Sequence, residues 1–109
     1  MTRIFSYGTL QMETVQRALF GRVVAMADDV LLGYESVPIE IDDPDVIEFS
    51  GSTTHLALVP GAPDAAIAGK VLEVGDADFA AVDAYEGVNY RRVDAQLASG
   101  SRAWVYVKA

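Results

Sequence analysis

The chain has 109 residues, the length of a single small domain, and a formal net charge of −8 at pH 7. A chain of this length can bury roughly two thirds of its unfolded surface in one core. Although 51% of the residues are hydrophobic, no run approaches the ~20 apolar residues of a spanning helix, so we expect no membrane partner. The 16 acidic residues outnumber the 8 basic ones and would repel the phosphates of a nucleic acid, so we expect no nucleic-acid partner either.

Cysteine and histidine usage narrows the chemistry. The sequence has no cysteine, which excludes disulfides, thiolate nucleophiles and zinc-finger sites, and His55 is its one histidine. One histidine is too few for a histidine metal cluster and leaves little basis for a histidine-based catalytic triad. At the N-terminus, residues 1–3 lead straight into the alternating pattern of a strand with no apolar signal region, so we expect a cytoplasmic protein.

The first elements in chain order are a strand and a helix. Residues 3–7 carry the apolar alternation of a strand that stops at Gly8. Residues 13–20 place apolar side chains at helical spacing, and Gly21 follows them. The sequence therefore predicts a short helix there, joined to the strand by a glycine-containing loop.

The next segment is strand-like and ends in an acidic cluster. Residues 23–41 favour one or two strands, broken by Gly33 and Pro38. Residues 42–45 have the sequence Asp-Asp-Pro-Asp and resemble a calcium loop in charge alone, since the required glycine and terminal glutamate are missing. We therefore expect a solvated loop at this cluster.

Two more strands and a second helix follow. Residues 55–59 and 68–74 predict strands. The spacing of the apolar residues then changes to that of a helix, with Asp76 placed to cap the helix and Gly87 to end it.

The last elements form a hairpin. Residues 90–98 and 102–107 predict two strands joined by a short Ser-Gly-Ser turn. If the turn keeps register, one face is apolar. The other face is aromatic and polar, and it contains Tyr90, Arg92, Gln96, Trp104 and Tyr106. This second face either lines a cleft or makes ordinary cross-strand pairs in solvent.

The order of these elements indicates an α+β fold with a single domain over residues 1–109. The order is not the strict alternation of a doubly wound sheet, and we find no internal repeat or linker. We expect a small mixed, mainly antiparallel sheet, curled toward a β-barrel and flanked by short helices.

Glu86 is the main candidate for acid/base chemistry. On the predicted helix it points within a narrow arc of Phe79 and Val82, the residues that should face the core. Burial and the negative end of the helix dipole would both raise its pKa, as a general base near neutral pH requires. The alternative is a frayed last turn that lets Glu86 swing into solvent.

The loop Tyr7-Gly8-Thr9-Leu10 is a second candidate. A strand that runs through a glycine turn into a helix can present backbone N–H groups to an anion or a carbonyl oxygen. The alternative is a plain turn in which Gly8 supplies unusual backbone angles. Neither Ser6 nor Thr9 has a recognisable base partner, and we expect His55 to be a surface or strand-end histidine.

Two motifs together resemble the γ-glutamylcyclotransferase-like family, also called AIG2-like. The first is Phe5-Ser6-Tyr7-Gly8-Thr9-Leu10 near the N-terminus, and the second is Val82-Asp83-Ala84-Tyr85-Glu86 followed by Tyr90-Arg91-Arg92. The second follows the family pattern of an aspartate, two positions, the catalytic glutamate, and then a tyrosine and an arginine. The resemblance spans nearly the whole chain.

The resemblance implies a fold, a site and a reaction. Such proteins are small β-barrels flanked by helices. By this resemblance Glu86 would be the general acid/base, and the backbone N–H groups of Gly8, Thr9 and Leu10 would bind the substrate. The loop that begins at Tyr7 would form one wall of the cavity, and Tyr90 and Tyr106 would line it.

The implied reaction closes a γ-glutamyl group on itself, releasing an amine and 5-oxoproline. The nucleophile belongs to the substrate, so no Ser, Cys or His is needed, and no metal or cofactor is expected. The partner is a small-molecule substrate, for which we favour a γ-glutamyl amine or amino acid. The alternative function is a non-catalytic module that binds a small carboxylate or amide in the same cavity.

Overall fold

The structure is a computed structural model that describes residues 2–40, 44 and 54–109. Its elements in chain order are β1 (Thr2–Ser6), the 3-10 turn η1 (Thr9–Gln11), α1 (Glu13–Phe20), β2 (Met26–Leu32), β3 (Tyr34–Glu40), β4 (Thr54–Pro60), β5 (Ala66–Val74), η2 (Asp76–Asp78), α3 (Phe79–Glu86), η3 (Gly87–Asn89), β6 (Tyr90–Gln96) and β7 (Arg102–Lys108). The acidic residues Asp42, Asp43 and Asp45 of the predicted loop lie outside the described residues.

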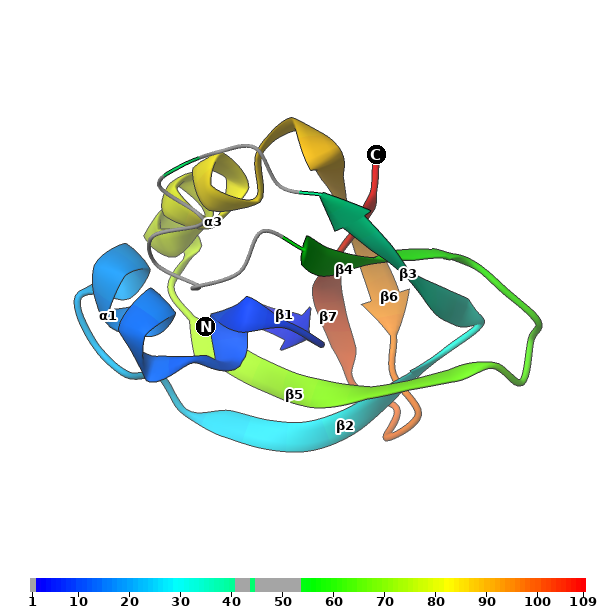
Figure 1. The fold of residues 1–109 in the computed structure, drawn as a ribbon. Helices are drawn as coiled ribbons and strands as arrows, with labels where there is room; N and C mark the ends of the chain where they lie inside the picture. The colour runs from blue at the N-terminus through cyan, green and yellow to red at the C-terminus, as the bar shows by residue number, and fades with distance from the viewer. Residues whose placement is uncertain (1, 41–43, 45–53) are drawn as a thin grey trace.

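An α+β architecture is observed, with a five-stranded sheet in the order β2-β5-β1-β7-β6 (Figure 1). The pairing of β1 with β7 is parallel, and the other described pairs are antiparallel. Strands β3 and β4 form a separate two-stranded sheet. Within the described residues β2 and β6 are the edges of the larger sheet, so the expected closure into a barrel is not seen.

The core lies on both faces of the five-stranded sheet. On one face, Ile4 and Leu72 pack with Val15 of α1 and Val82 of α3. On the other face, Phe5 and the apolar side of β7 pack with Leu58 of β4. Because side chains alternate along β1, adjacent residues Ile4 and Phe5 serve opposite cores. The helices and the β3–β4 hairpin therefore cover opposite faces of the sheet.

Gly69 lets β5 pack closely against its neighbour β1. A Cβ atom at Gly69 would lie 2.4 Å from the backbone oxygen of Ser6 and 2.7 Å from Cζ of Phe5. Only glycine leaves room for the Phe5 ring and the Ser6 carbonyl at this point of the sheet. The end of β1, from which the Tyr7–Leu10 loop continues, is thereby held against β5.

Two expectations from the sequence are wrong. Pro38 does not break a strand, because β3 pairs with β4 through Pro38 opposite Leu56, and a strand of a two-stranded sheet has a free edge that needs no N–H donor. Asp76 does not cap the second helix. Its carboxylate accepts a hydrogen bond from the Thr2 hydroxyl, and the carboxylate of Asp78 accepts one from the Gly75 N–H at 2.8 Å.

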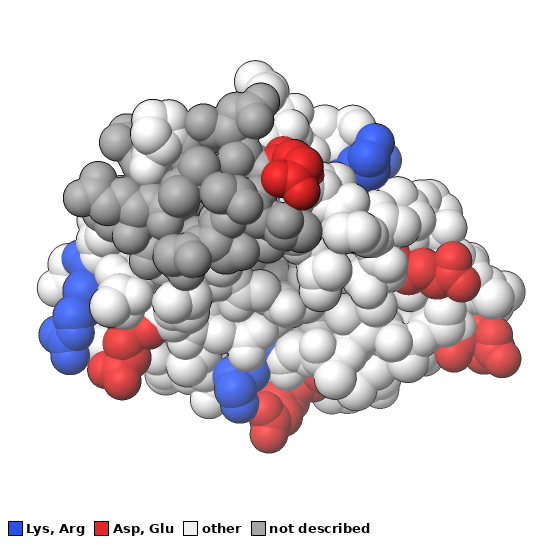
Figure 2. All heavy atoms as spheres, in the orientation of Figure 1, with Lys and Arg blue, Asp and Glu red and all other residues white. Residues whose placement is uncertain are grey.

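The surface of the described residues is mixed in charge. On the face drawn in Figure 2, acidic and basic side chains lie scattered, with no continuous basic patch among the described residues. Six ion pairs join described residues, among them Lys70 with Asp28 and Arg102 with Asp94. No helix within the described ranges is long and apolar enough to cross a membrane.

Candidate active site

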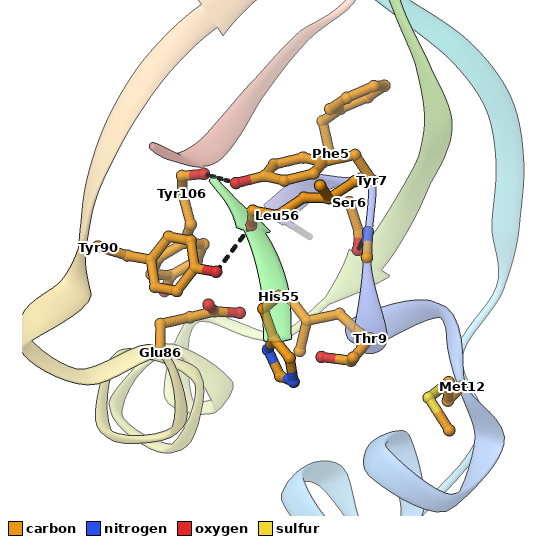
Figure 3. A pocket seen from close by; sticks show the side chains of 12 residues that line it. Phe5, Ser6, Tyr7, Thr9, Met12, His55, Leu56, Glu86, Tyr90 and Tyr106 are labelled. Carbon is orange, nitrogen blue, oxygen red and sulfur yellow. Dashed lines mark hydrogen bonds between the residues drawn. The ribbon is translucent and has the colours of Figure 1, made fainter. Parts of the chain in front are cut away.

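A cavity of about 350 Å³ lies where β1, β4, β6, β7 and α3 meet. Figure 3 shows its side chains converging from these elements. The described residues that line it are Phe5, Ser6, Tyr7, Gly8, Thr9, Leu10, Met12, His55, Leu56, Glu86, Tyr90 and Tyr106. All seven residues singled out from the sequence are among them: Tyr7, Gly8, Thr9, Leu10, Glu86, Tyr90 and Tyr106.

Glu86 is the last residue of α3 and points into this cavity (Figure 3). The helix ends there because Gly87 takes a φ of 68°, in the left-handed region that favours glycine, while its N–H still bonds the Asp83 carbonyl. The helix is therefore intact up to Glu86. The frayed turn considered as the alternative is not observed.

The environment of Glu86 raises the pKa of its carboxyl group. Loss of water around the buried carboxylate raises its pKa from 4.5 to about 8. Within the described part of the chain its carboxylate has no hydrogen bond or ion pair, and no described side chain has a buried polar atom without a partner. The oxygens of Glu86 are therefore open to the cavity rather than sealed in the core.

Three tyrosines form the walls beside Glu86. The Tyr7 hydroxyl donates to the Tyr106 carbonyl oxygen at 2.6 Å, and the Tyr90 hydroxyl donates to the Leu56 carbonyl oxygen at 2.7 Å. Burial first, and then nearby groups that include Glu86, raise the pKa of all three phenols. They stay neutral, and their hydroxyl oxygens can accept hydrogen bonds from a ligand.

The Gly8–Leu10 loop forms the wall on the side of β1. Gly8 has a φ of −143°, and a Cβ atom there would meet nothing within 4 Å. These backbone angles are unusual, as the plain-turn interpretation of the sequence expects, because the φ is not left-handed but the ψ of −137° lies outside the helical and extended regions. The Gly8 N–H lies 3.3 Å from the Ser6 hydroxyl oxygen. The N–H groups of Thr9 and Leu10 begin the 3-10 turn and have no partner within it.

Side-chain hydrogen bonds hold this loop in place. Thr9 Oγ1 lies 2.7 Å from the Tyr85 hydroxyl on α3. The fully buried Gln16 donates from Nε2 to the Leu10 carbonyl at 2.8 Å and accepts from the Val24 N–H at 3.0 Å. Gln16 thus ties the end of the loop to the segment that enters β2. Sequence reasoning missed this residue.

The aromatic and polar face of the last hairpin divides into two parts. Tyr90 and Tyr106 reach the cavity, whereas Gln96 is exposed. The Arg92 guanidinium lies 4.1 Å from the centre of the Phe79 ring and 5.0 Å from that of Trp104. Both interpretations of this face therefore apply, each to one end of the hairpin.

His55 is the cavity residue that sequence reasoning undervalued. It is the second residue of β4 and so lies at a strand end, as expected, but its half-buried side chain also lines the cavity (Figure 3). The only available signal was its place near the start of a strand. Among the described residues, no three His, Asp or Glu side chains converge in a way that could hold a metal ion.

These features define a small α+β protein with a desolvated carboxylate in an aromatic cavity. The chain belongs to the γ-glutamyl cyclotransferase, AIG2-like family, whose family profile matches residues 4–109. No curated protein matches the sequence significantly.

Solved structures share the fold. A γ-glutamyl cyclotransferase has a TM-score of 0.77 at 11% identity, over 99% of this chain and 66% of that one. A protein from Arabidopsis thaliana, solved in solution, has a TM-score of 0.74 at 22% identity, and the chain covers 61% of its length. An uncharacterized protein from Pyrococcus horikoshii has a TM-score of 0.67 at 22% identity, over 99% of this chain and 78% of that one.

Proposed function

We propose that this protein is a γ-glutamylcyclotransferase-type enzyme that converts a γ-glutamyl amine or amino acid into 5-oxoproline and the free amine. One observation carries the proposal. The Glu86 carboxylate, whose pKa burial raises to about 8, opens into a cavity whose opposite wall carries the first N–H groups of the η1 turn. A base and a set of hydrogen-bond donors that face one cavity are the groups this reaction needs.

In the proposed mechanism Glu86 moves one proton. The ionised carboxylate takes a proton from the substrate's α-ammonium group, and the resulting amine attacks the γ-carbonyl carbon to form a five-membered ring. The bond from that carbon to the leaving nitrogen then breaks as Glu86 returns its proton to that nitrogen. The ring nitrogen, which still carries two protons after the attack, gives its extra proton to the released amine, so the products are 5-oxoproline and an ammonium ion. The carboxylate is regenerated, so no metal, cofactor or nucleophilic side chain is consumed or required.

The Gly8–Leu10 loop would stabilise the charge that develops on the γ-carbonyl oxygen. The N–H groups of Thr9 and Leu10 are not used by the turn they begin, and Gly8 can exchange its 3.3 Å contact with Ser6 for a contact with the substrate. Removing one such donor from an oxyanion site typically costs ~10²- to 10³-fold in rate. Gln16 and Tyr85 would keep these donors in position through their bonds to the loop.

The volume of the cavity favours a small substrate. About 350 Å³ lies at the lower end of the ~300–1,000 Å³ of small-molecule sites. Tyr7, Tyr90 and Tyr106 offer apolar ring faces to the folded γ-glutamyl chain and neutral hydroxyl groups at the edges. Such walls would hold the α-amine close to the γ-carbonyl, which supplies much of the rate gain in a ring closure.

The direct test is a panel of γ-glutamyl amines and amino acids assayed for 5-oxoproline. The proposal requires turnover of at least one member and its loss in Glu86→Gln. Saturable binding of the panel without 5-oxoproline release from any member would instead establish a non-catalytic binding module.

A further inference from the structure

We propose that His55 is a substrate-binding residue that recognises the α-carboxylate of the γ-glutamyl group. This inference rests on the proposed function for the identity of the ligand. Figure 3 shows the His55 imidazole reaching into the space between Glu86 and Thr9. The substrate's α-carbon would lie in this space if its ammonium is to meet Glu86 while its γ-carbonyl faces the loop.

The charges on the γ-glutamyl group require two different partners. Its α-carbon carries both an ammonium and a carboxylate, so a site that binds it needs a proton acceptor beside a proton donor. Glu86 supplies the acceptor. A carboxylate buried without a hydrogen-bonded partner would be strongly disfavoured in a cavity walled by tyrosine rings.

His55 is the described lining residue whose side chain can carry a positive charge. The described lining contains no lysine or arginine. Residues 41–53, most of which the structure does not describe, contain no lysine, arginine or histidine in their sequence. An imidazole donates a hydrogen bond in either ionisation state and adds a positive charge when it is protonated.

The other donor side chains near the cavity do not offer a positive charge to it. Arg92 borders a neighbouring cavity, where it pairs with Asp83 at 3.4 Å and lies over the Phe79 ring. The Tyr7 and Tyr90 hydroxyl groups donate to backbone carbonyls, and Tyr106 donates to Asp83. Within the described lining, His55 is therefore the side chain that can offer the substrate carboxylate both an N–H donor and, when protonated, a positive charge.

A contact to the α-carboxylate would act on binding rather than on the chemical step. The carboxylate keeps its charge in the substrate, in the ring closure and in 5-oxoproline. An interaction that is equal in the ground state and the transition state lowers KM without changing kcat. The same contact should give 5-oxoproline an advantage over 5-oxoprolinamide, which has the same ring but no negative charge.

Calorimetric titration with 5-oxoproline and 5-oxoprolinamide tests the proposal without requiring turnover. We expect the wild-type protein to bind the acid about tenfold more tightly than the amide, as a charge-assisted hydrogen bond implies. His55→Gln and His55→Asn should each bring this ratio close to one, and either variant suffices if the other does not fold. Lys108→Gln removes an exposed positive charge outside the cavity and should leave the ratio unchanged.

Several results would overturn the assignment. They are equal affinity of the wild-type protein for acid and amide, an unchanged ratio in the folded His55 variants, or no binding of either compound. A turnover assay distinguishes this proposal from the proposed function. A protein that binds the acid more tightly than the amide but releases no 5-oxoproline from any γ-glutamyl compound would refute the proposed activity and leave the His55 assignment standing. If turnover is observed, the His55 variants should raise KM about tenfold and leave kcat within about twofold.

Discussion

The Tyr106 hydroxyl donates a hydrogen bond to the Asp83 carboxylate, with the two oxygens 2.5 Å apart. Asp83 lies almost one helical turn before Glu86 on α3, so this bond fixes the rotation of the helix that presents Glu86. The second oxygen of Asp83 lies 3.4 Å from Arg92, which packs over the Phe79 ring at the start of the same helix. The last hairpin therefore both lines the cavity and orients the proposed base.

Glu86→Gln should abolish turnover while retaining ligand binding. The amide keeps the size and polarity of the side chain but cannot exchange a proton, so we expect kcat to fall ~10²- to 10⁴-fold. Single-turnover release of 5-oxoproline measures this, and calorimetry with 5-oxoproline checks that the cavity is intact. Activity near the wild-type level in the Gln variant would exclude Glu86 as the base.

The pH dependence of kcat/KM should show an acidic limb with its midpoint near pH 8. Burial raises the pKa of Glu86 to about 8, and only the ionised form can accept the proton from the substrate ammonium. The ammonium ionisation of the free substrate is titrated separately and removed from the profile. A midpoint near the ordinary glutamate value of 4.5 would show that the catalytic carboxylate is well solvated.

Glu86→Gln should also stabilise the protein at neutral pH. Since the pKa of Glu86 is raised on folding, from 4.5 to about 8, the folded state holds the proton more tightly than the unfolded chain. The stability that this proton contributes is fully present below pH 4.5 and is lost as pH rises toward 8. At pH 7 the cost is on the order of 3 kcal/mol, which the Gln variant avoids.

Chemical denaturation at pH 7 and at pH 4.5 measures this difference between wild type and variant. The advantage of the Gln variant should shrink at the lower pH, where wild-type Glu86 is protonated in the folded state and about half protonated in the unfolded chain. A Gln variant that is less stable than wild type at pH 7 would mean that the carboxylate makes stabilising contacts as an anion.

Gly69→Ala should destabilise the fold by about 2 kcal/mol or more. The new methyl group would lie 2.4 Å from the Ser6 carbonyl oxygen, which is backbone and cannot move aside cheaply. Gly75→Ala is the matched control, because a Cβ atom there would approach Asp78 Oδ2 only to 3.5 Å and its φ of −87° suits any residue. Urea denaturation should show a lower stability for the Gly69 variant than for the Gly75 variant. Equal stability of both variants would contradict the close packing of β5 against β1.

The regular elements were predictable because their signals are local. The helix at residues 13–20 and the hairpin that begins at Tyr90 appear where apolar spacing and turn residues place them. Pro38 was misjudged because the cost of a proline depends on whether its side of the strand has a neighbour, and pairing partners are not visible in a single strand. Curling toward a barrel was expected from the order of the elements and again from the family resemblance, and the described strands do not show a closed barrel.

The candidate site was predictable only where a residue's role follows from its own element. Glu86 could be placed because helical geometry sets its direction relative to Val82. Gln16 could not, since it looks like an ordinary polar helix residue until the Val24 N–H and the Leu10 carbonyl converge on it. His55 reaches the cavity through the way the β3–β4 hairpin packs on the sheet, a long-range relation that no local pattern encodes.

The central place of β1 in the sheet also constrains the order of folding. β1 pairs with β7 in parallel, and the Tyr7 hydroxyl bonds the carbonyl of a residue 99 positions later. During synthesis the middle of the sheet therefore cannot form until β7 has left the ribosome. Before that, β1 can pair only with β5, on one of its two sides. Contacts of such long sequence separation make folding slow, on the order of milliseconds to seconds. Until β7 arrives, the nascent chain exposes a hydrophobic strand edge that chaperones can bind.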